Sequence, residues 1–406
     1  MNFTPTFRAC GLENPFFLNK SLTRFILKSF FIILIAFISN SVGSKTKFSN
    51  FEDYQFTDET FKLIEITDGL NYPWGMTFIN DQDLIITEKK GNIIKVNTST
   101  GEKKLIKHNV KNIKYSGQGG LLDILYHKDG FLYFTYSYGY DSKIRTNTFK
   151  ESSTAIARGR LENDELKDTE LLFLAKPRLY TNKHFGSRIA IKDEYLFASI
   201  GERGMGMIAQ NPTKHPGSFI RIMTNGDIPK DNPYILEKKK NWLPEIFQIG
   251  LRNPQGITIS PHDGEIYFSN HGPRGGDSIG VVKFSGNYGW KNIAWGGTEY
   301  SGKKIGKSAL NDIYDKPVKI WVPSIGIGNL TFYNGKTFPD WIGDLLITAT
   351  GSKMLIRLDF NNGKITREEL ILKDKIGRIR DLEIDSSGDI YLIIDEFNSK
   401  LWKITK

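Results

Sequence analysis

The chain contains 406 residues, which is enough for two ordinary domains or for one large β architecture. Its 39 glycines and its aromatic content of 13% favour an all-β class, because glycine permits the positive φ angles of tight turns and aromatic rings suit pleated surfaces. The basic residues behind its net charge of +10 are dispersed, which favours a solvated surface over a nucleic-acid-binding stripe. We therefore expect no nucleic-acid partner.

A secretory signal is the first predicted element and covers residues 1–43. Basic residues precede the apolar run Phe30–Ile38, and small residues of the kind that a signal peptidase reads follow it. The run is shorter than the roughly 20 apolar residues of a membrane span, although an uncleaved anchor over Phe25–Val42 stays open as an alternative. Cleavage near Gly43 would leave a linker over residues 44–54 and a periplasmic or secreted protein without stable membrane insertion.

The chain has one cysteine, Cys10, and it lies in the segment that cleavage would remove. The mature protein would then contain no disulfide bond and would perform no thiol redox chemistry. Residues 1–43 carry four basic residues and one acidic residue, so their removal lowers the net charge from +10 to +7. A small polyanionic ligand could exploit the positive charge that remains.

From residue 55 to its end, the sequence repeats one pattern about six times: an apolar stretch, a polar turn, an alternating strand, a glycine and a second strand. Gly75–Thr87, Gly256–Phe268 and Ile379–Ile394 are three of the copies. Apolar and polar residues alternate over roughly four to eight positions, as in short antiparallel strands. Repeats of roughly 45 to 80 residues with about four strands each predict a six-bladed β-propeller with four-stranded antiparallel blades over residues 55–406.

Closure of the ring is predicted from two segments near the ends of this domain. Phe61–Ile66 precedes the first full repeat, and Lys400–Thr405 ends the last one. Pairing between these segments would remove two exposed strand edges. Two packed β-sandwiches are the alternative architecture, but they would not explain so many copies of one pattern.

Polar residues interrupt the strand pattern at four places. In Ser116–Gly120 the glycines allow close backbone approach and Gln118 offers both a donor and an acceptor, although a flexible turn between blades explains the segment equally well. In His184–Arg188 the histidine stands at the start of a strand and could act as a general base, because neutral imidazole accepts a proton near pH 7. Considered alone, a structural or solvent-exposed histidine is the simpler interpretation of His184.

The third place combines an Arg-Asn pair with a glycine-rich loop that follows the next strand. Arg252 and Asn253 can bind carboxylates or carbonyl groups, and arginine can do so in bidentate fashion. Gly272 and Pro273 can present carbonyl oxygens to a hard cation such as Ca²⁺. A plain loop explains these segments poorly, because the glycines, Asp277 and the Arg-Asn pair cluster so densely.

The fourth place is Gly377–Asp381, in which Arg378 and Arg380 have the spacing of neighbours on one face of a strand. Two adjacent guanidinium groups favour an anion. The sequence contains no recognisable Cys/His metal pattern, phosphate-binding Gly-Lys-Thr or Ser-His-Asp signature, so nucleotide chemistry and serine hydrolysis are unsupported. One base, several cations and a calcium-type loop together suit an acidic organic cofactor.

At these residues the chain resembles the soluble pyrroloquinoline-quinone-dependent aldose sugar dehydrogenases, the glucose/sorbosone dehydrogenase family of six-bladed propellers. The matching phrases are Pro73–Met76, Gly117–Leu121, His184–Arg188, Gly201–Gly204, Gly250–Gly256, His271–Asp277, Asn287–Trp290, Trp321–Ser324 and Arg378–Asp381. They run in family order over nearly the whole mature chain, which makes the ensemble highly specific.

The resemblance implies oxidation of an aldose at the anomeric carbon to a lactone, with hydride transfer to pyrroloquinoline quinone and electrons passing to an unidentified acceptor. His184 would take the proton of the anomeric hydroxyl. The cofactor's carboxylates and carbonyls would be held by Gln118, Arg252, Asn253, Arg378 and Arg380, and Ca²⁺ by Gly272 and Pro273. Cations suit a tricarboxylate, and a Lewis acid stabilises the charge that arrives with the hydride.

Three departures from the family pattern concern this site. Ser278 stands where relatives carry glutamate, so a second, structural calcium site with Ser278 and Tyr288 loses a carboxylate. Glu202 stands where aspartate is usual. Gly351 takes the place of a cofactor lysine, and Lys353 is expected to substitute for it because residues two apart along a strand face the same side.

Two other functions stay open for this sequence. A propeller that has lost catalysis would serve as a carbohydrate- or protein-binding module, and a calcium-dependent lactone hydrolase would use the same architecture. Turnover of aldoses with added quinone separates the dehydrogenase from the binding module. A lactone hydrolase would instead act without quinone.

Overall fold

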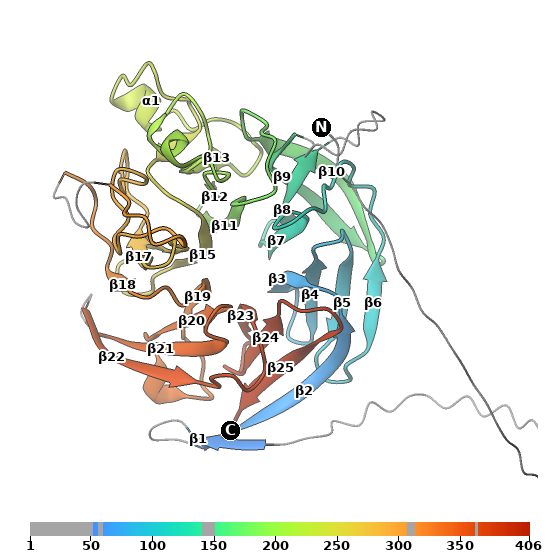
Figure 1. Cartoon of the computed structure of the whole chain (residues 1–406). Coiled ribbons are helices and arrows are strands. Elements are labelled where there is room, and N and C mark those ends of the chain that lie inside the picture. The colour runs from blue at the N-terminus through green and yellow to red at the C-terminus, as the bar shows by residue number, and fades with distance from the viewer. Residues whose placement is uncertain (1–51, 56–59, 140–150, 307–312, 362–363) are drawn as a thin grey trace, which may run out of the picture. The chain divides into compact units, whose positions relative to one another are not determined.

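A computed structural model describes residues 52–55, 60–139, 151–306, 313–361 and 364–406 (Figure 1). The predicted signal at residues 1–43, with Cys10, lies outside the described residues. Of the expected linker only residues 52–54 are described, and they belong to strand β1 (Glu52–Gln55).

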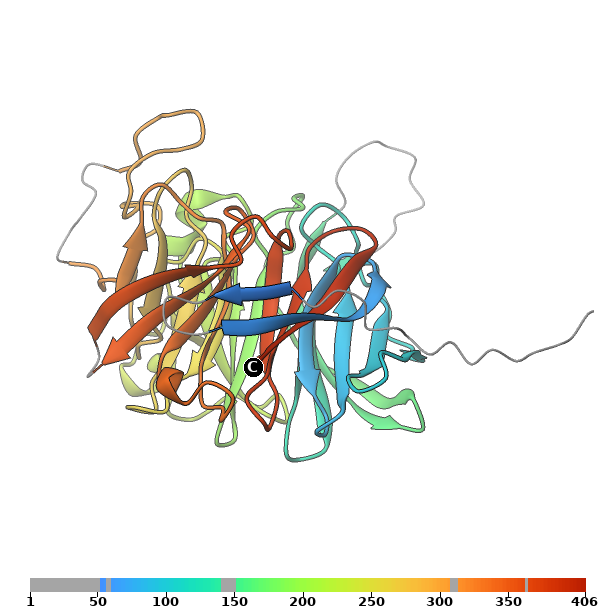
Figure 2. The same cartoon turned by 90° about the horizontal axis from the view of Figure 1, so that it is seen from below.

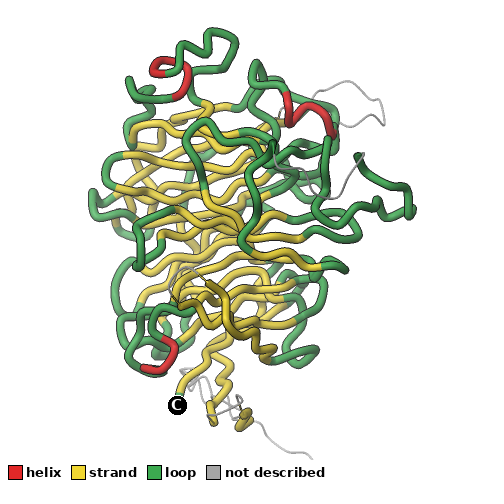
Figure 3. Tube along the Cα trace, turned by 90° about the vertical axis from the view of Figure 1, so that its left-hand side faces the viewer, coloured by secondary structure: helices red, strands yellow, loops and turns green. Residues whose placement is uncertain are grey.

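Strands make up almost all of the regular structure in the described part of the chain, as Figure 3 shows. They form six antiparallel sheets around a central axis (Figure 1). Helical turns are limited there to α1 (Pro233–Leu236), η1 (Gly206–Gln210) and η2 (Pro339–Trp341). The predicted all-β class and six-bladed propeller with four-stranded antiparallel blades are confirmed.

Each sheet places one innermost strand beside the axis. These strands are β3 (Pro73–Phe78), β7 (Leu121–Tyr126), β11 (Gly186–Lys192), β15 (Pro254–Ile259), β19 (Ile327–Phe332) and β23 (Ile379–Ile384). The second strands are β4 (Asp83–Glu88), β8 (Phe131–Gly139), β12 (Tyr195–Ile200), β16 (Ile266–Asn270), β20 (Leu345–Ala349) and β24 (Ile390–Ile394).

The outer half of each sheet is formed by its third and fourth strands. The third strands are β5 (Ile93–Asn97), β9 (Ser152–Glu162), β13 (Ser218–Met223), β17 (Asp277–Val281), β21 (Met354–Asn361) and β25 (Ser399–Thr405). The fourth strands are β6 (Lys103–Ile106), β10 (Glu165–Leu174), β14 (Ile246–Gln248), β18 (Lys319–Trp321), β22 (Lys364–Ile371) and β2 (Thr60–Leu70).

The ring closes where the first and last parts of the domain meet. Strand β2 pairs antiparallel with β25, so that Leu63 lies opposite Ile404, and β1 adds a fifth strand outside β2. Figure 2 shows the blue β2 beside the red C-terminal strands. The predicted closure is therefore confirmed, and the alternative of two packed β-sandwiches is wrong. Closure pairs the edges that β2 and β25 would otherwise leave open.

Burial follows from the position of each strand in its blade. Every residue of β24 is buried, whereas five of the eight residues of β22 are exposed. Inner strands are covered on both faces by neighbouring blades, and for this reason they read as nearly continuous apolar runs. Tyr133 and Ile156 of one blade thus share a buried cluster with Leu196 and Ile220 of the next.

Arg188, Asp123 and Asp381 form an ion cluster between the innermost strands, at the axis of the propeller. The Nη1 of Arg188 lies 2.8 Å from Asp123 and 3.0 Å from Asp381, and its Nε donates to the carbonyl of Gln255 at 2.9 Å. Its guanidinium also stacks 4.2 Å from the ring centroid of Trp74. Arg188 and these partners come from five of the six innermost strands.

The sixth innermost strand joins the same cluster through Asp381. Asn329 of β19 donates to Asp381 at 2.6 Å, and the backbone N–H of Met76 donates to its other oxygen at 2.9 Å. The axial cluster of Arg188, Asp123 and Asp381 therefore ties all six blades together. It also fixes the positions from which the loops at one mouth of the channel depart.

Candidate active site

Residues that begin the innermost strands gather at one mouth of the channel. Gln118 lies just before β7, His184 before β11, Asn253 before β15 and Arg378 before β23. Because the innermost strands are related by the rotation of the blades, their starting ends all lie on the same face of the propeller. Loops on a rigid scaffold of this kind are the usual place for binding residues.

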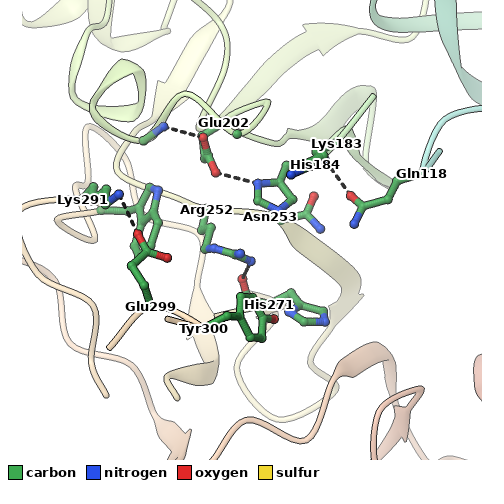
Figure 4. Close-up of a pocket in the computed structure, with 13 residues that line it drawn as sticks. Gln118, Lys183, His184, Glu202, Arg252, Asn253, His271, Lys291, Glu299 and Tyr300 are labelled. Carbon is green, nitrogen blue, oxygen red and sulfur yellow. Dashed lines mark hydrogen bonds and ion pairs between the residues drawn. The ribbon is translucent and has the colours of Figure 1, made fainter. Parts of the chain in front are cut away.

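The first of two cavities at this mouth has a volume of about 350 Å³ (Figure 4). Most of its lining consists of polar and charged side chains. It is lined by Gln118, Lys183, His184, Glu202, Gly204, Gly206, Arg252, Asn253, His271, Trp290, Lys291, Glu299 and Tyr300. The cavity thus brings together four of the residues predicted from the sequence, namely Gln118, His184, Arg252 and Asn253.

His184 and Glu202 form a close pair inside this cavity. Nδ1 of His184 lies 2.6 Å from Oε1 of Glu202, and the two side chains are 12% and 2% exposed. The backbone N–H of His184 donates to Gln118 at 2.7 Å. A Cβ at Gly201 would lie 2.2 Å from the carbonyl oxygen of His184, so only glycine permits this approach of the two loops.

Burial and charge set the protonation of this pair. Burial lowers the pKa of His184, and the positive charge of Arg252 lowers it further, against the raising effect of Glu202. Burial alone would raise the pKa of Glu202, but the hydrogen bonds from His184 and from the N–H of Gly206 hold it below its ordinary value. Glu202 is therefore a carboxylate that accepts the Nδ1–H of a neutral imidazole. Nε2 of His184 is left as a proton acceptor.

Arg203 fixes the segment that leads to His184. Its guanidinium donates to the carbonyl oxygens of Thr181 at 2.6 Å and Lys183 at 3.0 Å. It also stacks 3.4 Å from the ring centroid of Phe185. His184 itself has a φ of 49°, a left-handed conformation that is uncommon for a residue with a side chain. Such backbone strain persists where surrounding contacts hold it, as they do here.

Arg252 and Asn253 are held by the backbone around them. Nη1 of Arg252 donates to the carbonyl oxygen of His271 at 2.9 Å, and Oδ1 of Asn253 accepts the N–H of Gly186 at 3.0 Å. Burial lowers the pKa of Arg252, although Glu202 and more distant carboxylates act in the other direction. Arg252 stays cationic within the cavity, because even a lowered guanidinium pKa lies far above neutrality.

The second cavity adjoins the first and shares Gln118, Asn253 and His271 with it. Its volume is about 240 Å³. The remaining lining residues are Trp74, Lys89, Leu122, Phe185, Gly186, Gln255, Thr350, Arg378, Arg380 and Asp395. It therefore brings Arg378 and Arg380 together beside the first cavity, on the face of the propeller that carries His184.

Contacts with neighbouring strands fix the two arginines of the second cavity. Nη1 of Arg378 donates to the carbonyl oxygen of Thr350 at 3.2 Å. Arg380 forms an ion pair with Asp395 and donates to Oε1 of Gln255 at 3.1 Å. Nε of Arg380 is buried without a hydrogen-bond partner.

The expectation that Gly351 and Lys353 lie along one strand is wrong. Gly351 and Lys353 do not lie along a strand but in the turn between β20 and β21, where Lys353 has a φ of 48°. Lys353 is exposed and lines neither cavity. A period-two argument holds only within extended backbone, and the chain reverses direction at this point.

The residues expected at calcium do not form a ready-made ion cage. Gly272 and Pro273 are buried but line neither cavity, and the carbonyl oxygen of Gly272 accepts from Nδ1 of His271 at 3.0 Å. Ca²⁺ takes about six to eight oxygen ligands, far more than these two carbonyls supply. The parts of the chain that the structure describes contain no group of three His, Cys, Asp or Glu side chains that could hold a metal ion.

The pair proposed for a second calcium ion serves the packing of its own blade. Ser278 is buried within β17 and lies opposite Ile320. The hydroxyl of Tyr288 donates to the carbonyl of Val281 at 2.9 Å and accepts its N–H at 2.8 Å. These contacts already use the Tyr288 hydroxyl, and the geometry of this pair gives no support to an ion.

Several lining residues were not predicted. His271, Trp290 and Glu202 lie in phrases quoted for the resemblance, but their types alone did not mark them as neighbours of His184. Other lining residues come from turn-rich segments without a recognisable pattern. These are Lys89, Lys183, Lys291, Glu299, Tyr300 and Asp395. Lys291 and Glu299 form a 2.6 Å ion pair at the rim of the first cavity (Figure 4).

No helix in the described part of the chain is both long enough and apolar enough to cross a bilayer.

Comparison with known proteins agrees with this architecture. The aldose sugar dehydrogenase YliI of Escherichia coli (strain K12) is 32% identical over 389 residues, covering 93% of this chain and 98% of that protein. The crystal structure of the soluble aldose sugar dehydrogenase of Escherichia coli in its apo form matches with a TM-score of 0.79 at 32% identity, covering 85% of this chain and 99% of that one. The quinoprotein glucose dehydrogenase B of Acinetobacter calcoaceticus is 28% identical over 268 residues, which are 58% of this chain and 53% of that protein.

A family model described as Glucose / Sorbosone dehydrogenase matches residues 70–403, which span nearly all of the propeller. The chain therefore belongs to the glucose/sorbosone dehydrogenase family.

Proposed function

We propose that this protein is a quinoprotein oxidoreductase that oxidises aldose sugars at the anomeric carbon to lactones, with pyrroloquinoline quinone as hydride acceptor. One observation carries the proposal: the paired His184 and Glu202 line a cavity that adjoins a second cavity with two guanidinium groups. The names of the relatives, an aldose sugar dehydrogenase and a quinoprotein glucose dehydrogenase, support the substrate class and the cofactor.

The cationic lining of the second cavity suits a molecule that carries several carboxylates. Arg378 and Arg380 face it with Asp395 as the carboxylate that pairs Arg380, and Nε of Arg380 is buried without a partner. Two guanidinium groups against one carboxylate leave a positive excess that an acidic ligand would neutralise. Gln118 and Asn253 line both cavities and would hold the end of the cofactor nearest to His184. When bound there, the quinone supplies the acceptor for the hydride.

His184 would act as the general base. Glu202 accepts the Nδ1–H and so keeps Nε2 free to take the proton of the anomeric hydroxyl. The anomeric C–H bond breaks in the same oxidation, and its electron pair leaves with the hydrogen as hydride to the acceptor. The sugar thereby loses one proton and one hydride and becomes a lactone. The carboxylate of Glu202 then stabilises the imidazolium that has formed.

Arg252 prepares the site for this proton transfer. Its positive charge lowers the pKa of His184, which keeps the imidazole neutral before the sugar reacts. Fixed by the carbonyl of His271, Arg252 also presents a donor toward negative charge that develops in the cavity. Lys291 and Glu299 lie at the rim and would bind sugar hydroxyls, because their ion pair is partly exposed.

We propose that Ca²⁺ binds to the protein only when the cofactor is also bound. Gly272 and Pro273 would supply two carbonyl ligands, so the quinone would have to contribute further oxygens. In a calcium titration by calorimetry, we expect no measurable binding to the protein alone and clear binding once quinone is present. Equal calcium affinity with and without quinone would contradict this shared site.

The proposal also covers location and electron transfer. We propose that the protein is exported, that cleavage occurs near Gly43, and that the mature protein is periplasmic or secreted. An acceptor outside this chain would reoxidise the reduced quinone. The N-terminal sequence of the protein recovered after expression with residues 1–43 tests the cleavage. A protein that retains these residues would support the uncleaved anchor instead.

Reconstitution tests the function directly. Purified protein is mixed with quinone and Ca²⁺, and reduction of a redox dye is followed with several aldoses. We expect turnover that requires both the quinone and the sugar. No turnover with any aldose would favour a propeller that only binds carbohydrate or protein, and hydrolysis of lactones without quinone would favour a lactone hydrolase.

Replacing Glu202 with glutamine tests the pairing with His184. The loss of the carboxylate should lower kcat by roughly 10²-fold, because the base is no longer held in one tautomer. Since Glu202 raises the pKa of His184, the variant should also shift the acidic limb of the pH profile toward lower pH. The check is kcat as a function of pH for parent and variant. An unchanged acidic limb would show that Glu202 does not act on His184.

A further inference from the structure

Lys89 occupies a defined position in the second cavity. It directly follows β4, and its ammonium lies 5.5 Å from the ring centroid of Tyr72. Its backbone N–H donates to the carbonyl of Tyr72 at 3.1 Å, and its carbonyl accepts the N–H of Leu121 at 3.0 Å. A Cβ at Gly120 would lie 2.1 Å from this carbonyl oxygen, so the two segments pack without space between them. The start of the Lys89 side chain is therefore fixed.

The charges around Lys89 do not balance. Lys89, Arg378 and Arg380 line the cavity together with Asp395, the one carboxylate in its lining, and Asp395 is already paired with Arg380. Lys89 forms no ion pair with any residue that the structure describes. Burial lowers its pKa, and Arg380 and Arg378 lower it further, although Asp395 acts in the opposite direction. Positive charge thus exceeds negative charge in a partly buried space.

We propose that Lys89 is a third cationic anchor for the carboxylates of the cofactor, opposite Arg378 and Arg380. Lys89 comes from the first blade and the arginines from the last, and these two blades are neighbours in the ring. An acidic group in the cavity would therefore meet an ammonium from one side and guanidinium groups from the other. This inference rests on the proposed function, and it gives Lys89 the role that the sequence had suggested for Lys353.

The chemistry of lysine suits this role. An ammonium acts as a point charge on a flexible stem and pairs with a carboxylate without the bidentate geometry that arginine requires. Lys89 is half-buried and lines the cavity that holds the other cations. Exposed Lys353 offers neither condition, because solvent would screen its charge.

Binding of pyrroloquinoline quinone by the Lys89→Met protein tests this inference. Affinity is measured by fluorescence quenching in the absence of sugar, so that the result does not depend on turnover. We expect the Kd to rise roughly 10- to 100-fold, as is typical when a charge-assisted contact is lost. Lys89→Arg should recover most of the affinity. Lys90→Met is the matched control, since Lys90 is the exposed neighbour and its replacement removes the same charge.

Thermal melts of the same proteins separate binding from stability. Lys89→Met should unfold at the temperature of the parent protein, so that its weaker binding cannot be assigned to a loosened fold. An unchanged Kd for Lys89→Met would overturn the inference, and a rise for Lys353→Met alone would return the role to Lys353. If the parent protein binds no quinone, the proposed function itself fails and the role of Lys89 fails with it.

Discussion

Replacing Arg188 with methionine is expected to lower the free energy of unfolding by about 3–5 kcal/mol, because two buried carboxylates would lose their cation. The Arg188 side chain is 2% exposed, and Asp123 and Asp381 are 8% and 1% exposed. Burial and mutual repulsion already raise the pKa of Asp123, and Arg188 is the main opposing influence. Chemical denaturation of parent and variant near neutral pH gives the difference.

Two further variants make this result specific to the axial cluster. Lys400→Met removes the ion pair with Glu65, which also joins two strands but is partly exposed, and should cost less than about 1 kcal/mol. Adding Asp123→Asn and Asp381→Asn to the Arg188 variant should restore part of the loss, because it removes the unpaired charges. If Arg188→Met and Lys400→Met were equally mild, the cluster would not be what joins the blades.

Replacing His184 with alanine is expected to lower kcat by about 10²- to 10⁴-fold, the range that general base catalysis supplies. Affinity for the quinone should change little, because the proposed anchors are the cations of the second cavity and not the imidazole. Steady-state dye reduction gives kcat, and fluorescence quenching gives the Kd. The combination of slow turnover and intact binding is what identifies a base.

A histidine outside the site provides the control for this experiment. His108 hydrogen bonds to the carbonyl of Gly91 at 2.7 Å and lines neither cavity at the channel mouth, so His108→Gln should leave kcat unchanged. Unchanged kcat in the His184 variant would remove the proposed base from the mechanism. Loss of quinone affinity with kcat preserved at saturating quinone would instead make His184 a binding residue.

The fold was predictable because it depends on a pattern that the chain repeats. The alternation of each copy predicts strands, and the number of copies predicts the blades. The pairing of Phe61–Ile66 with Lys400–Thr405 follows from the need to close the ring. The axial cluster was not predictable in this way, because Arg188 meets Asp123 and Asp381 only after strands far apart in sequence converge. Nothing local to these residues identifies them as partners.

The site was only partly predictable for a related reason. Types and spacing singled out His184, Arg252, Arg378 and Arg380, which the fold brings to one mouth of the channel. The strand argument for Lys353 was wrong, because Gly351 and Lys353 lie in a turn and not along a strand.

Lys89 escaped notice because it stands in a Lys-Lys-Gly turn after a strand, where a solvated charge is the ordinary expectation. Burial against Tyr72 and Leu121 is a tertiary fact. Glu202 was noted as a replacement for aspartate, but its 2.6 Å contact with His184 needed the approach of two loops. In both cases the missing information was which segments the ring brings together.

An experimental structure with quinone and an aldose bound would test the central claim most directly. We predict the carboxylates of the quinone within hydrogen-bonding distance of Arg378, Arg380 and Lys89. The anomeric hydroxyl of the sugar should lie within reach of Nε2 of His184. A quinone bound at the other mouth of the channel, or a sugar whose anomeric carbon is remote from His184, would contradict the account.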